Sequence, residues 1–199
     1  MPRNVSNNMK KSLILTIAIL LAIPAAASAN LLVNPGFETG NFSGWSPYAF
    51  GSEQVSSANP HTGAYEARIN NYGWITQTVN SVTPNTAYKL SSYLYMPQDG
   101  GEASISITFY NSTGTTSFQQ ERTWERIPGS AQYEKIETDW LTAPDYTAYA
   151  RVRCSVASAG SYIDFDDVSL DVIPEPSSLL IFFSGLTGLF GLLSHRKGV

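Results

Sequence analysis

The stretch Tyr88-Lys89-Leu90-Ser91-Ser92-Tyr93-Leu94-Tyr95-Met96 decides the fold class. Its even-numbered positions are mostly large and apolar, whereas its odd-numbered positions are polar or, at Tyr93 and Tyr95, aromatic with a polar tip. Successive side chains of a strand point to opposite faces of the sheet. This two-residue period therefore predicts a β-strand with one buried face.

The same alternation recurs after that stretch. Runs at 104–110, 135–140 and 151–156 each place apolar side chains on one face, with turn residues between the runs. Short strands repeated at intervals of about ten residues, without an amphipathic helix, are typical of a β-sandwich or barrel. The sequence therefore predicts an all-β domain.

The burial of several single side chains follows from these patterns. Cys154 lies on the apolar face of the 151–156 run, so we expect a buried structural thiol rather than a reactive one. Trp45 and Trp140 are expected in the core. Trp74 follows a turn-like stretch at 70–73 and is expected to be exposed.

The last strand of the domain changes phase. Ile163 and Phe165 are apolar at odd positions, whereas Val168 and Leu170 are apolar at even positions. A shift of one residue predicts a β-bulge at Asp166-Asp167, and a bulge re-aims side chains. The two carboxylates are either solvated acids at a strand irregularity or part of a cation site.

The content of charge, cysteine and histidine excludes several classes of function. Between Asn30 and Ile173, seven basic residues stand against fifteen acidic ones, a net charge of −8, so nucleic acid is not an expected partner. The single cysteine, Cys154, and the two histidines, His61 and His195, cannot build a Cys/His zinc site. No pattern marks a catalytic site, and we expect no enzyme.

Residues 1–29 are typical of a secretory signal peptide. Lys10-Lys11 precede an apolar run at 13–23, and Ala27-Ser28-Ala29 supplies the small residues for cleavage after Ala29. An uncleaved anchor is the alternative, but eleven residues are too few for a helix to span a bilayer core of about 30 Å. The sequence therefore predicts export.

Residues 174–199 combine Pro174-Glu175-Pro176, an apolar stretch at 179–193 and a basic cluster at Arg196-Lys197. This order resembles the PEP-CTERM sorting signal of exported bacterial proteins. The resemblance implies a single C-terminal apolar helix in the inner membrane with its basic end cytoplasmic, followed by processing by an exosortase-type enzyme. A permanent tail anchor is the other interpretation. Either way, we expect the domain in the cell envelope or the extracellular space.

Six stretches of the domain form an ordered set: Asn30–Glu38, Ser43–Trp45, Gly63–Ile69, Ile75–Val79, Tyr88–Tyr93 and Phe165–Leu170. Together they resemble the landmarks of β-jelly-roll carbohydrate-binding modules of the family 4, 9 and 22 type. The resemblance covers nearly all of residues 30–173 and implies a jelly roll with a non-catalytic, glycan-binding function.

The resemblance also implies a structural Ca²⁺ that ties the first strand to the last. Glu38 and Asp166 match the ligand positions, and Asp167 could replace Asp166 because the bulge leaves their facing uncertain. Calcium takes six to eight oxygen ligands, which carboxylates and loop carbonyls can supply without histidine or thiolate.

Sugar binding requires flat apolar faces for pyranose C–H groups and polar side chains for hydroxyls. We expect a groove lined by Trp74, Tyr93, Tyr95, Tyr110, Arg151 and Arg153, acting in adhesion to extracellular or biofilm polysaccharide. The alternative is that exposed tyrosines reflect strand propensity and cross-strand pairing. The protein would then be a structural component of the matrix without a groove.

Overall fold

The computed structural model describes residues 30–48, 52–97, 101–125, 132–157 and 162–173. The predicted signal peptide and the predicted sorting segment lie outside these residues. The described residues form strands, turns and loops without any helix, so none of them forms a helix that could cross a membrane. The all-β prediction is confirmed for this part of the chain.

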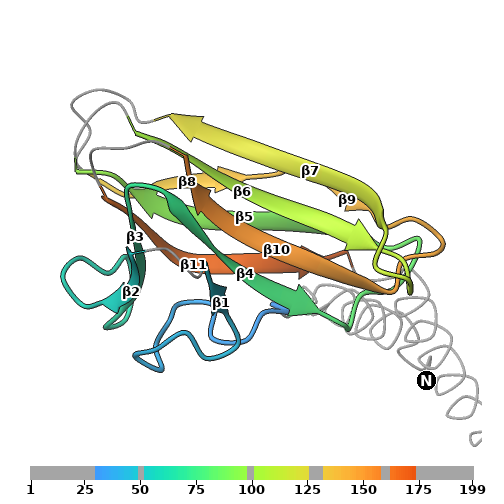
Figure 1. The fold of residues 1–199 in the computed structure, drawn as a ribbon, viewed down its shortest axis with the longest axis horizontal. Helices are drawn as coiled ribbons and strands as arrows, with labels where there is room; N and C mark the ends of the chain where they lie inside the picture. The colour runs from blue at the N-terminus through green and yellow to red at the C-terminus, as the bar shows by residue number, and fades with distance from the viewer. Residues whose placement is uncertain (1–29, 49–51, 98–100, 126–131, 158–161, 174–199) are drawn as a thin grey trace, which may run out of the picture.

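One layer of the sandwich is a five-stranded antiparallel sheet. Its strands are β1 (Ser46–Pro47), β4 (Gly73–Val79), β6 (Glu102–Tyr110), β7 (Thr116–Glu125) and β10 (Tyr149–Val156). They follow the order β1-β4-β10-β6-β7, and Figure 1 shows β4, β10, β6 and β7 running side by side. Strand β10 therefore lies in the middle of this sheet.

The second layer is a six-stranded antiparallel sheet. Its strands are β2 (Ser52–Ser56), β3 (Glu66–Asn70), β5 (Ala87–Tyr95), β8 (Glu134–Glu137), β9 (Leu141–Thr142) and β11 (Tyr162–Val172). The order is β2-β3-β11-β5-β8, and β9 also pairs with β5 (Figure 1). Strands adjacent in sequence often belong to opposite layers: β3 and β4, β5 and β6, and β10 and β11 each cross the sandwich.

The core forms where the apolar faces of the two sheets meet. Ile105 and Ile107 of β6 and Leu90 and Leu94 of β5 are fully buried. Large apolar side chains at every second position bury one face of each sheet and leave the other face polar. Alternation along each strand therefore predicts correctly which side chains enter the core.

The predicted bulge in the last strand is confirmed. The register of β11 against β5 shifts between Asp166 and Ser169, and Asp167 adopts the left-handed conformation at φ 46°. Phe165 before the shift and Val168 after it are both fully buried. The bulge therefore keeps apolar side chains in the core on both sides of an odd-to-even change of phase.

The tryptophan predictions are only partly correct. Trp45 is buried, and its ring packs 5.5 Å from that of Phe37. Trp140, however, is 47% exposed. Strand β8 ends at Glu137, and the chain re-enters the sheet only at Leu141, which is buried. The short break changes the phase and turns Trp140 outward.

Candidate functional site

The outward face of the five-stranded sheet carries four of the six predicted glycan-binding residues. Trp74 lies on β4, Arg151 and Arg153 on β10, and Tyr110 on β6. Their neighbours in sequence on each strand, such as Ile75, Val152 and Phe109, are buried in the core. The four side chains therefore share one face.

Aromatic rings gather at one end of this face. The ring of Tyr48 packs 3.6 Å from that of Trp74, and the ring of Tyr72 meets Trp74 edge-on at 5.9 Å. The backbone N–H of Tyr48 donates to the carbonyl of Trp74 at 2.9 Å. The guanidinium of Arg153 lies 5.0 Å from the Trp74 ring centroid, within the range of a cation–π contact.

A second aromatic pair lies at the other end of the face. Tyr110 of β6 and Tyr149 of β10 are paired across the strands, and their rings are stacked at 4.9 Å with an interplanar angle of 7°. The guanidinium of Arg151 lies 5.1 Å from the Tyr110 ring centroid. Each arginine is thus held against the aromatic group at its own end.

Small hydroxyl side chains separate the two aromatic groups. Ser104, Ser106 and Thr108 occupy the outward positions of β6, and each pairs across the strands with an outward position of β10. The hydroxyls of Ser104 and Ser155 are 2.8 Å apart. The three β6 side chains are themselves buried, so between its aromatic ends this face offers the hydroxyls of β4, at Thr76 and Thr78, and the two guanidiniums.

The predicted single groove is wrong because it combines two opposite faces. Tyr93 and Tyr95 belong to β5, and their neighbour Leu94 enters the core from the six-stranded sheet. They therefore point away from the sandwich on the side opposite to Tyr110 and Arg151. Alternation shows which residues of one strand share a face, but not which sheet the strand joins.

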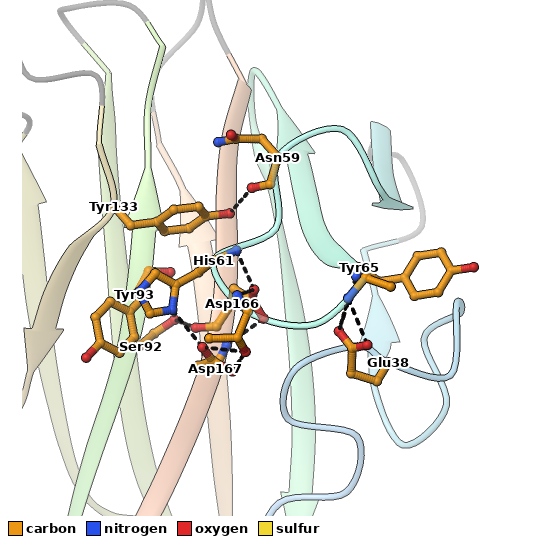
Figure 2. A network of polar contacts seen from close by, with 11 residues as sticks. Glu38, Asn59, His61, Tyr65, Ser92, Tyr93, Tyr133, Asp166 and Asp167 are labelled. Carbon is orange, nitrogen blue, oxygen red and sulfur yellow. Dashed lines mark hydrogen bonds and ion pairs between the residues drawn. The ribbon is translucent and has the colours of Figure 1, made fainter.

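The loop that precedes β3 covers Tyr93. The imidazole of His61 stacks on the Tyr93 ring at 3.8 Å, and Tyr133 meets His61 at 5.0 Å (Figure 2). The Tyr133 hydroxyl donates to the carbonyl of Asn59 at 2.7 Å. The loop is thus held over this part of the six-stranded sheet by bonds at several points, so this face is the weaker candidate.

The two bulge carboxylates hold the same loop. Asp166 Oδ2 accepts the backbone N–H groups of His61 at 2.8 Å and Thr62 at 3.1 Å (Figure 2). Asp167 accepts the Thr62 hydroxyl at 2.8 Å, and its Oδ2 lies 2.7 Å from Nδ1 of His61. Burial raises the pKa of Asp166 to about 6, although the backbone N–H donors act in the opposite direction.

Glu38 anchors the far end of that loop. Its carboxylate accepts the backbone N–H of Ala64 at 3.0 Å and that of Tyr65 at 3.1 Å. Gly63 precedes these donors at φ 65°, and a Cβ there would overlap the Glu38 carboxylate. Only glycine therefore permits this approach.

The three predicted metal ligands surround Gly36. The position of a Cβ at Gly36 would lie 3.4 Å from Asp167 Oδ1, 3.5 Å from Asp166 Oδ1 and 3.7 Å from Glu38 Cγ. Two carboxylate oxygens thus converge on one small space, and an oxygen-only donor set is what Ca²⁺ prefers. Among the described side chains, no group of three or more His, Cys, Asp or Glu could hold a metal ion. Backbone carbonyls would have to supply the other ligands.

A buried ion pair lies next to the bulge, on the outward face of the six-stranded sheet. Arg68 donates from Nε and Nη2 to the two carboxylate oxygens of Asp164 at 2.7 and 2.8 Å. Burial raises the pKa of Asp164 to about 6, against the effect of the guanidinium. Arg68 also lies 3.6 Å from the buried carboxylate of Glu66.

The comparisons with known proteins agree with this architecture. Residues 29–158 match the family described as "Carbohydrate binding domain" (CBM_4_9). The chain belongs to this family. No curated protein matches the carbohydrate-binding chain.

Solved structures share the fold of this carbohydrate-binding domain at low identity. TmCBM61 in complex with β-1,4-galactotriose is 23% identical with a TM-score of 0.59, covering 73% of this chain and 100% of that one. The CBM22-1 xylan-binding domain of Paenibacillus barcinonensis Xyn10C is 13% identical, with a TM-score of 0.56 and coverages of 75% and 97%.

A third similar structure is part of a much larger protein. The enzymatically active domain of tailspike protein 4 from bacteriophage CBA120 is 15% identical with a TM-score of 0.58. The match covers 72% of the carbohydrate-binding chain but only 21% of the tailspike chain. At this identity the likeness shows the fold alone.

Sequence reasoning missed several residues of the carbohydrate-binding domain. The ring of Tyr48 packs on Trp74, and the ring of Tyr149 stacks on Tyr110. Neither tyrosine was among the predicted glycan-binding residues. Tyr149 carried a signal, because it continues the outward series of Arg151 and Arg153. The positions of Tyr48 and His61 depend on loop conformation, which alternation does not predict.

Proposed function

We propose that the chain binds polysaccharide through the outward face of the five-stranded sheet and acts by adhesion rather than catalysis. One observation carries this proposal: two aromatic groups stand at opposite ends of a single sheet face, with arginines and hydroxyls between them. Membership of a carbohydrate-binding family supports the same reading.

The chemistry of this face suits a sugar chain. Aromatic rings such as Trp74 offer flat apolar surface to the C–H side of a pyranose, and guanidinium and hydroxyl groups bond its hydroxyls. A linear chain that runs along β10 would contact both aromatic groups. Its length would set the number of contacts, so we expect affinity to rise with oligosaccharide length up to the span of the face.

The carboxyls with raised pKa support a non-catalytic role. Asp164 and Asp166 are both fully buried. The first is bonded to Arg68 on both oxygens, and the second accepts backbone N–H groups. A glycosidase needs two carboxyls that flank the scissile bond, and neither of these groups is accessible to a substrate.

Two tyrosines on opposite faces provide the test. Binding of soluble polysaccharides is measured by retardation in gels that contain them, followed by calorimetry with oligosaccharides of increasing length. Tyr110→Ala is expected to weaken binding, while Tyr93→Ala, on the opposite face, leaves it unchanged. The reverse result would move the site to the six-stranded sheet. Inertness to every glycan would leave the structural matrix role.

The sequence patterns at residues 1–29 and 174–199 support a proposal for where the protein acts. The pattern at 1–29 supports export, and Pro174-Glu175-Pro176 with the apolar and basic segments after it supports insertion in the inner membrane and processing by an exosortase-type enzyme. The adhesive domain would then act at the cell surface or in the extracellular matrix.

A structural calcium ion is the remaining proposal. Asp166 and Asp167 would hold it beside Gly36, with Glu38 at the edge of the same space. An ion there would bind the bulge of β11 to the start of the domain and would neutralise acids that burial places together.

A further inference from the structure

The two arginines on the candidate binding face present unused hydrogen-bond donors. Among the described residues, the guanidinium groups of Arg151 and Arg153 make no hydrogen bond or ion pair, and their contacts are the cation–π contacts with Tyr110 and Trp74. A guanidinium carries five N–H donors in a planar fork. Aromatic rings of the protein therefore position both guanidiniums, and the N–H donors of the two groups can bond an acceptor on a ligand.

Positive charge is concentrated along β10. Arg151 and Arg153 are two residues apart on this strand, about 7 Å at roughly 3.3 Å per residue, and point the same way. The outward positions of β4 and β10 include no acid. The acids of this sheet lie on β6 and β7, at Glu102 and at the register positions of Glu121 and Glu125. Glu53 of the other sheet accepts the backbone N–H of Trp74.

We infer that this face selects an anionic polysaccharide, whose carboxylate or sulfate groups bond Arg151 and Arg153 while its rings contact the aromatic groups. The inference rests on the proposed glycan-binding function and names its substrate class. Guanidinium forks match planar carboxylates and sulfate oxygens in a bidentate manner, and such charge-assisted bonds are about twice as strong as neutral ones.

The geometry suits an extended chain. From Ser155, in the row of Trp74, to Tyr149, in the row of Tyr110, β10 advances six residues, about 20 Å at roughly 3.3 Å per residue. The arginines occupy the two outward positions between these rows. Sugar rings at the ends and charged groups in the middle would therefore be bound by one continuous strand.

The selectivity arises from contact rather than from long-range attraction. The domain has a net charge of −8 between Asn30 and Ile173, which opposes the approach of a polyanion. This repulsion is screened over about 8 Å at physiological ionic strength. Short hydrogen bonds to two preoriented guanidiniums act inside that distance.

Two pairs of polymers test the inference with the full exported protein. Polygalacturonate is compared with its fully methyl-esterified form, and dextran sulfate with dextran, by calorimetry and by retardation in gels. We expect the charged member of one pair to bind about tenfold or more tightly than its neutral partner. The pair that responds shows whether carboxylate or sulfate is recognised.

Arginine variants distinguish the effect of positive charge from that of the planar guanidinium geometry. Arg151→Gln with Arg153→Gln should remove the preference for the charged polymer. Arg151→Lys with Arg153→Lys should keep only part of it, because lysine retains charge but loses the fork. Lys89→Gln, on the opposite face, is the matched control and should change nothing.

Three outcomes would overturn the inference. Equal binding of both members of each pair, tighter binding of the neutral member, or a preference that survives loss of both arginines would each contradict it while leaving glycan binding intact. Absence of binding to any glycan would also overturn the proposed function of the face.

Discussion

Trp74 is positioned before any ligand arrives. Tyr48 covers one side of its ring at 3.6 Å, Tyr72 meets it edge-on, and the guanidinium of Arg153 lies 5.0 Å from its centroid. A ring that is already held loses little conformational freedom on binding. Rigid aromatic anchors of this kind tend to dominate the free energy of recognition.

We therefore predict that Trp74→Ala weakens glycan binding by about 2 kcal/mol, roughly thirtyfold in Kd. The matched control is Trp140→Ala, because Trp140 is also partly exposed but lies beside β9, outside this face. Retardation in polysaccharide gels compares the two variants. If both variants lost the same affinity for the glycan, or if only Trp140→Ala lost affinity, Trp74 would not be part of the binding site.

Arg68 is the cation that faces two buried acids of the six-stranded sheet. It is the partner of the fully buried Asp164 and the nearest described cation to Glu66. Removal of one partner of a buried pair leaves an uncompensated charge. We expect Arg68→Ala to lower the free energy of unfolding by about 3–5 kcal/mol, measured by urea denaturation.

Lys89 provides the comparison for Arg68. Its ion pair with Glu137 lies on the same outward face but is partly exposed, and surface pairs contribute only about 0–1 kcal/mol. If Lys89→Ala lowered the free energy of unfolding as much as Arg68→Ala does, burial would not determine how much the loss of an ion pair destabilises the domain.

At the scale of elements, the alternation of apolar and polar residues predicted the long strands, but not which strands pair with each other. The period of Tyr88–Tyr95 identified β5 and its buried face correctly, and the change of phase near Asp166 located the bulge of β11. Sheet membership depends on pairings between distant segments, which no local period records. For that reason Tyr93 and Tyr110, both on polar strand faces, were assigned to one groove although they lie on opposite sides.

The bulge of β11 is also where calcium should act. A ligand that binds only the folded state adds about 2.7 kcal/mol at a hundredfold excess over Kd. We expect calcium to raise the melting temperature above that in EDTA, and Glu38→Gln or Asp166→Asn to abolish the difference. An identical midpoint with calcium and with EDTA would rule out the site.

At the scale of the whole molecule, the fold extends beyond the family match. The match ends at residue 158, yet β11 begins at Tyr162 and lies between β3 and β5 in the six-stranded sheet. It contributes Ile163, Phe165 and Leu170 to the core. The sheet is incomplete without it.

We predict that a chain ending at residue 158 fails to unfold cooperatively, whereas one ending at Ile173 retains a sharp thermal transition. The reason is that loss of β11 exposes the core and leaves β3 and β5 without a partner between them. Circular dichroism with heating distinguishes them. A cooperative transition in the shorter chain would mean that β11 is dispensable.

Processing of the C-terminus is the last prediction at this scale. If the sorting signal operates, protein exported by its native host should end near Pro174-Glu175-Pro176 and lack Arg196 and Lys197. Proline disfavours a helix and restricts the residue before it, so the sequence of this segment favours an extended chain that an enzyme could reach. Intact-mass measurement decides the matter, and a C-terminus at Val199 would indicate a plain tail anchor.

The attachment of β11 has a mechanical consequence. The strand leads directly to the C-terminal segment, and its neighbours β3 and β5 bond it on both sides. Because ladder hydrogen bonds lie perpendicular to the strands, a pull along β11 from Ile173 loads many of them in shear at the same moment. A force that peeled an edge strand would break them one by one. A domain held by this end would therefore resist drag from flowing liquid better than one held by β7.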